Sequence, residues 1–92
     1  MKLGFIGIGA ISEHVITGLL QHGGFDEIVV VSERSSHRSA RLADRFTNVE
    51  VEPDNQTIVD RVDVVFVATL PEQILDLLDT LAFRQGQAIV SM

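Results

Sequence analysis

Residues 2–9 of the chain read KLGFIGIG, and residues 10–20 read AISEHVITGLL. The first stretch is a short apolar run, which predicts a buried strand over Lys2–Ile8. In the second stretch the apolar residues recur at helical spacing, at Ile11, Val15, Ile16, Leu19 and Leu20. Three glycines lie within six residues, at Gly4, Gly7 and Gly9. Because glycine loses more conformational freedom on folding than any other residue, this cluster indicates a tight turn that lets another group approach bare backbone.

The rest of the chain alternates between strand and helix patterns. Further strands are predicted over Glu27–Ser32, Val49–Glu52 at a sheet edge, a central Val62–Thr69, and Gln87–Met92. Three helices lie between them: one capped by Ser35 or Ser36 that buries Leu42, Ala43 and Phe46, a short one capped by Asp54, and one starting at Pro71 that buries Ile74, Leu75, Leu78 and Leu81. The predicted fold class is therefore α/β, a Rossmann-type doubly wound, mostly parallel sheet with helices on both faces.

The composition bounds the class of protein. Ninety-two residues suit one domain spanning 1–92, and 46% hydrophobic residues with 22% charged argue against disorder. No apolar run approaches the ~20 residues of a membrane span, and a net charge of −6 disfavours nucleic-acid binding. The absence of cysteine excludes disulfides and thiolate metal sites, and a cytoplasmic location is expected. The three histidines lack metal-ligand spacing, so no metal site and no catalytic residue is assigned.

The sequence Gly7-Ile8-Gly9 lies between a predicted strand and a predicted helix, the context in which a dinucleotide-binding glycine pattern is meaningful. The first glycine permits the turn. The second lets a pyrophosphate reach the backbone, where the helix N-terminus supplies free N–H groups. Ser12 takes the third small position, at which helix packs closely on strand, and Gly4 is expected to relieve crowding inside the strand. The alternative is that the glycines only form a turn.

The residues after the second strand bear on which dinucleotide is bound. Ser32 stands where NAD-binding proteins usually carry an acid, and Glu33 follows it. Four of the seven Lys and Arg residues come next along one helical face, at Arg34, Arg38, Arg41 and Arg45. A solvated face is the simpler interpretation for the last two, whereas Arg34 and Ser35 would lie beside the adenosine ribose and suit a 2′-phosphate. NADP (as NADPH) is predicted over NAD, although an inward Glu33 would favour NAD.

The whole chain resembles the N-terminal half of pyrroline-5-carboxylate reductases. MKLGFIGIGAISEHVITGLL is similar to that family's opening, and VVVSERSSHRSARLADRF to its second strand and following helix. DNQTIVDRVDVVFVATLPEQILDLLDTL is similar to its middle. These motifs are shared with deazaflavin-dependent NADP oxidoreductases and, more loosely, with β-hydroxyacid dehydrogenases.

The resemblance implies three groups of cofactor-binding residues. Ile8, Gly9, Ala10, Ile11 and Ser12 match the pyrophosphate turn. Ser32, Arg34 and Ser35 match the reader of the 2′-phosphate, and Ala68, Thr69, Leu70 and Pro71 match the turn on the nicotinamide side. The chain departs from the family at Ala10 and Ile11, where asparagine and methionine are common, and at Leu70, where lysine is common.

The resemblance also implies a longer enzyme. The 92 residues would be the N-terminal part, followed by a helical domain that forms a homo-oligomer and most of the imino-acid pocket. The full enzyme would pass a hydride from NADPH to the C=N carbon of a cyclic imine in proline biosynthesis, and the fragment alone is expected to be inactive. A non-catalytic dinucleotide-sensing module and a Rossmann-like domain without a ligand are the alternatives, and the Arg34/Ser35 pair and the abrupt end after AIVSM favour the enzyme.

Overall fold

The computed structural model describes residues 1–7, 10–33, 36–68 and 71–91. The predicted alternation of strand and helix is confirmed. The elements are β1 (Leu3–Ile6), α1 (Ala10–Gln21), β2 (Val29–Ser32), α2 (Ser36–Arg45), β3 (Val49–Glu52), α3 (Asn55–Arg61), β4 (Val64–Val67), α4 (Pro71–Thr80) and β5 (Ala88–Ser91). Pro71 opens α4 as predicted, because its missing N–H has no partner to lose in the first turn of a helix.

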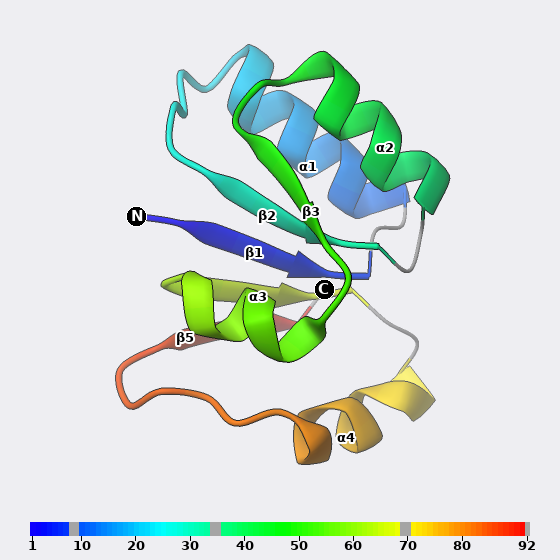
Figure 1. The fold of residues 1–92 in the computed structure, drawn as a ribbon, viewed down its shortest axis with the longest axis vertical. Helices are drawn as coiled ribbons and strands as arrows, with labels where there is room; N and C mark the ends of the chain where they lie inside the picture. Colours follow the sequence, from blue (N-terminus) through cyan, green and yellow to red (C-terminus); the bar gives the residue numbers. More distant parts are fainter. Residues whose placement is uncertain (8–9, 34–35, 69–70, 92) are drawn as a thin grey trace.

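The five strands form one parallel sheet in the order β3-β2-β1-β4-β5 (Figure 1). The chain builds one half of the sheet from β1 to β3 and then crosses back to add β4 and β5 on the other side of β1. The doubly wound fold is thereby confirmed, and so is the edge position of Val49–Glu52. The segment predicted as the central strand forms β4, which is interior, while β1 takes the middle position.

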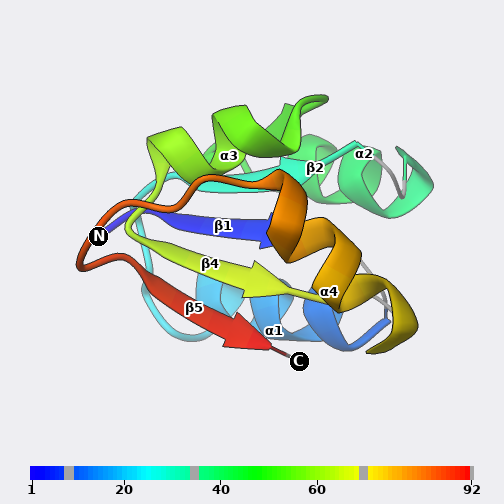
Figure 2. The ribbon, with the colours of Figure 1, turned by 90° about the horizontal axis from the view of Figure 1, so that it is seen from below.

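Helices cover both faces of the sheet: α1 and α2 lie on one face, and α3 and α4 on the other (Figures 1 and 2). Successive strand residues point to opposite faces, so β1 contributes Leu3 and Phe5 to one hydrophobic core and Ile6 to the other. The ring of Phe5 stacks on Phe66 of β4 with 4.6 Å between centroids. Across the described parts of the chain, no helix combines the length and the apolar character needed to cross a membrane.

Gly4 lies on the face of β1 that is covered by α3. A Cβ atom at this position would lie 2.7 Å from Ile58 Cγ2 and 2.9 Å from Val62 Cγ2, closer than carbon atoms pack. Both of these neighbours are fully buried. The expectation that Gly4 relieves crowding is confirmed, since its missing side chain is what lets α3 approach the middle of the sheet.

One residue of the buried face predicted for α4 is wrong. Leu75 of α4 was expected to be buried, but 74% of its surface is exposed. Ile74 and Leu81 pack on the core as predicted, and Leu77 packs there with them. The stripe of α4 that packs on the core is narrow, and Leu75, about 100° around the helix from Ile74, falls outside it.

The C-terminal end of α3 is capped by side chains from the loop that precedes β5. One guanidinium nitrogen of Arg84 donates to the carbonyl oxygens of Val59 at 2.9 Å and Asp60 at 2.8 Å, and the other donates to that of Val62. Gln87 Nε2 donates to Val59 and Val62, each at 2.8 Å. The last carbonyls of a helix have no partner within it, so these donors satisfy groups that would otherwise be partly buried and unpaired.

We expect Arg84→Met to lower the free energy of unfolding by about 2 kcal/mol, because hydrogen bonds from a charged donor contribute roughly 1.5–3 kcal/mol. Arg61→Met is the matched control. Arg61 lies in the same helix end but pairs at the surface with the carboxylates of the exposed Glu50 and the half-buried Glu52, and such pairs contribute roughly 0–1 kcal/mol. Urea denaturation of the two variants measures the difference. Equal losses would show that Arg84 acts only as a surface charge.

Candidate functional site

The ends of three neighbouring strands bring predicted site residues to one edge of the sheet. Gly7 follows β1, Ser32 ends β2 and Ala68 follows β4. The backbone N–H of Ala68 donates to the carbonyl of Ile6 at 2.9 Å, which places the turn after β4 beside the turn after β1. The strand order reverses here, and in open α/β sheets ligands bind outside the carboxyl ends of the strands at such a reversal.

The turn after β1 depends on glycine at its first position. Gly7 has a φ of 83°, a conformation that residues with a Cβ rarely adopt. Its N–H donates to Ser32 Oγ at 2.9 Å. The backbone carbonyl of Ser32 accepts in turn from the hydroxyl of Ser39 in α2, and Ser32 and Ser39 are 2% and 0% exposed. Two buried serines therefore connect the end of β2 to the glycine turn.

The first helix begins directly behind this turn. α1 starts at Ala10, three residues after Gly7, and runs for 12 residues. Its first N–H groups have no partner within the helix and carry partial positive charge, which together attract an anion. Ser12 in the first turn is 0% exposed, and its hydroxyl has no hydrogen-bond partner in the structure as described. A residue enclosed this fully has to be small, as the third position of the glycine pattern requires.

The arginines of α2 lie against α1. Glu13, in the first turn of α1, accepts from Arg38 at 3.1 Å and from Arg41 at 2.9 Å. Two guanidinium groups against one carboxylate leave one net positive charge between the two helices. Arg45 donates to Gln21 at 3.0 Å, farther along the same seam. Arg41 and Arg45 are exposed, in agreement with the solvated face expected for them.

The predicted site residues fall into three groups. Gly7, Ser12, Ser32 and Ala68 meet at the carboxyl edge of the sheet, as described above. Ala10 and Ile11 open α1 at the same edge, and Pro71 opens α4. The remaining predictions lie outside the described residues: Ile8, Gly9, Arg34, Ser35, Thr69 and Leu70.

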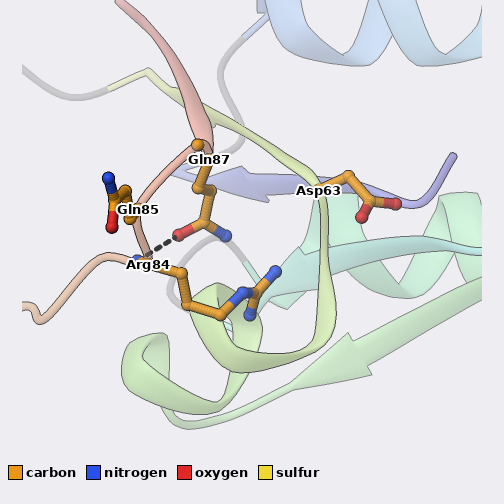
Figure 3. Close-up of a pocket in the computed structure, with 5 residues that line it drawn as sticks. Asp63, Arg84, Gln85 and Gln87 are labelled. Carbon is orange, nitrogen blue, oxygen red and sulfur yellow. Dashed lines mark hydrogen bonds between the residues drawn. The ribbon is translucent and has the colours of Figure 1, made fainter.

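A hollow of about 160 Å³ lies at the opposite, amino edge of the sheet (Figure 3). Asp63, Arg84 and Gln87 line it, and each precedes β4 or β5. The guanidinium of Arg84 is already bound to the carbonyls at the end of α3. The hollow is lined by Arg84 and Gln87, the residues that cap α3, and it is separate from the edge that carries the glycine turn.

The sequence matches, over residues 2–92, the family described as NADP oxidoreductase, coenzyme F420-dependent. The chain belongs to this family. The prediction of a cofactor-binding domain from an NADP-linked oxidoreductase is thereby confirmed at the level of the family. Coenzyme F420 is a deazaflavin, so the family description also covers the deazaflavin-dependent alternative.

Individual relatives agree with the predicted resemblance. A pyrroline-5-carboxylate reductase of Corynebacterium melassecola is 32% identical over an alignment of 89 residues, and the match covers 92% of this chain and 33% of the relative. The structure of 1-pyrroline-5-carboxylate reductase from Streptococcus pyogenes is 30% identical with a TM-score of 0.77, covering 100% of this chain and 33% of that one. The chain thus spans about a third of the length of these relatives.

Two imine reductase structures share the fold at lower identity. The enzyme from Pseudomonas sp. is 21% identical with a TM-score of 0.79, over 99% of this chain and 31% of that one. The enzyme from Myxococcus stipitatus, in complex with NADP+, is 23% identical with a TM-score of 0.73, over 100% of this chain and 32% of that one. The five-stranded parallel sheet of this family member is therefore common to reductases with little sequence in common.

Sequence reasoning missed two residues of this edge. Ser39 lies three residues before the buried Leu42 on α2, so its buried position could have been inferred from helical spacing. Its bond to the carbonyl of Ser32 could not, since that contact joins two different elements. The ion pairs of Glu13 could not be inferred from the sequence either, because its arginine partners are 25 and 28 residues away along the chain.

Proposed function

We propose that the chain is the NADPH-binding domain of an imine reductase related to pyrroline-5-carboxylate reductase. The observation that carries the proposal is the glycine turn. A residue at positive φ follows the central strand, a helix N-terminus comes three residues later, and the strand order reverses at that point. This combination suits a dinucleotide pyrophosphate, whose charge meets backbone N–H groups without a side chain between them.

The residues present fit this cofactor. Gly7 takes a backbone conformation that keeps the turn tight, and the enclosed Ser12 lets α1 sit close behind it. In the proposed role Gly7, Ile8, Gly9, Ala10 and Ile11 would surround the pyrophosphate. Ala68, Thr69, Leu70 and Pro71 would line the nicotinamide side. Bound NADPH supplies the hydride, and the chain holds and orients the ring that carries it.

Two observations favour NADP over NAD. Ser32 carries no charge at the strand end where an acid would repel a 2′-phosphate. Arg38, in the first turn of α2, adds positive charge near the same strand end, where it pairs with Glu13. Glu33 is exposed next to Ser32 and opposes this preference.

The activity of the whole protein extends the proposal beyond these residues. Because the relatives are about three times as long, the imine pocket, the oligomer and the hydride transfer that leads to proline would belong to a longer protein. A cytoplasmic location stays a prediction. A deazaflavin-dependent NADP oxidoreductase is the second candidate function, and the family description favours it.

Calorimetric titration of the purified domain with NADPH and NADH tests the cofactor assignment. We expect NADPH to bind at least tenfold more tightly, and Arg34→Ala to lower the affinity for NADPH by about 10- to 100-fold, the loss of one charge-assisted phosphate contact of roughly 1.5–3 kcal/mol. NADH affinity should change little in that variant. Tighter binding of NADH, reversed by Glu33→Ala, would assign the site to NAD, and no binding of either would remove the proposal.

A further inference from the structure

Ser32 was assigned to the 2′-phosphate by resemblance, but its contacts in the structure point elsewhere. Its Oγ lies 2.9 Å from the backbone nitrogen of Gly7 and accepts that N–H. Its backbone carbonyl accepts the hydroxyl of Ser39. Only 2% of the residue is exposed, so a hydrated dianion has little access to it. These contacts face the turn after β1 and the first turns of α2.

We propose that Ser32 is a positioning residue for the glycine turn, held in place by Ser39, and that its hydroxyl does not contact the 2′-phosphate that distinguishes NADPH from NADH. The proposal deepens the proposed function and rests on it. In this role Ser32 fixes the N–H of Gly7 to the end of β2. The start of the turn is thereby held in front of the N-terminus of α1, where the pyrophosphate that the two dinucleotides share would bind.

The energetic argument is that the N–H of Gly7 is buried together with its acceptor. A buried donor left without a partner costs roughly 1–3 kcal/mol. Without the hydroxyl, the turn therefore either carries that cost or rotates Gly7 to reach another acceptor. Rotation is the cheaper response for a glycine, because its backbone is the least restricted of all residues. Gly7 would then no longer be fixed to the end of β2.

Ser32→Ala tests this assignment. We expect the affinities for NADPH, NADH and ADP-ribose to fall together by about tenfold, so that the NADPH-to-NADH ratio stays at its wild-type value. ADP-ribose is included because it contains the pyrophosphate and lacks both the nicotinamide and the 2′-phosphate. Ser32→Thr keeps the hydroxyl and should restore most of the affinity. Ser39→Ala should act in the same direction with a smaller effect.

A measurement without ligand reports on the turn itself. The amide proton of Gly7 should exchange with solvent slowly in the wild type and at least tenfold faster in Ser32→Ala. Val49→Ala is the control for general destabilisation. Val49 is a core residue at the start of β3, where it pairs with Val29, whereas Ser32 lies at the other end of β2 and pairs with Glu52. It should lower the melting temperature and leave the three affinities unchanged.

The outcomes separate the two proposals. Loss of NADPH affinity alone in Ser32→Ala would make Ser32 a phosphate reader and overturn the inference, and so would wild-type affinity for all three ligands. Failure of the wild-type domain to bind any of the three would instead remove the proposed function. If Ser32→Ala does not fold, Ser39→Ala carries the test, because a fall in the NADPH-to-NADH ratio in that variant would contradict the positioning role.

Discussion

Gly4→Val is expected to prevent the domain from folding, and Gly4→Ala to lower its free energy of unfolding by about 3 kcal/mol. The first added carbon would meet Ile58 Cγ2 at 2.7 Å and Val62 Cγ2 at 2.9 Å. Both neighbours are fully buried in the core under α3, so neither can move without disturbing its own packing. Overpacking of a core costs roughly 1–3 kcal/mol, and valine adds two further carbons to the same space.

Urea unfolding followed by circular dichroism measures the loss in Gly4→Ala. The matched control is Gly18→Ala, because Gly18 lies inside α1 and an added Cβ there meets nothing within 4 Å. Alanine is the better helix former by roughly 1 kcal/mol, so this variant should be more stable than the wild type. If the two alanine variants changed stability in the same direction, the close approach of α3 to β1 would not explain the glycine at position 4.

Most strands and helices of the fold could be predicted from the sequence alone. The period of apolar residues predicted the strands and helices, since buried strands and amphipathic helices differ in spacing. Val49–Glu52 has the predicted bounds, and Pro71 begins the predicted helix. Leu75 was misplaced because its burial depends on how much of the sheet α4 covers, which its own spacing does not contain.

The candidate site was predictable to the extent that topology determines it. Parallel strands bring their carboxyl ends to one edge, so the order of elements was enough to place Gly7, Ser32 and Ala68 together. The partner of each side chain was not predictable. The bond from Gly7 to Ser32 joins residues 25 positions apart, and the contact with Ser39 depends on where α2 lies on the sheet.

Gly7→Ala is expected to weaken binding of both NADPH and NADH by at least tenfold. Gly7 has a φ of 83°, and a residue with a Cβ in the left-handed region costs roughly 1–2 kcal/mol. The turn can relieve this strain by changing φ, but the N–H of Gly7 then leaves Ser32 Oγ. Either response disturbs the amides in front of α1 on which the pyrophosphate would rest.

Gly24→Ala separates backbone strain from the effect on the site. Gly24 also has a positive φ, of 69°, with nothing within 4 Å of an added Cβ, and it follows α1 at the other edge of the sheet. Thermal unfolding should show similar losses of stability in the two variants, whereas calorimetry should show reduced affinity in Gly7→Ala alone. Gly7→Asn should lose less affinity than Gly7→Ala, because asparagine adopts positive φ more readily. Wild-type affinity in Gly7→Ala would mean that the dinucleotide does not depend on this turn, and the edge of the sheet chosen for it would be wrong.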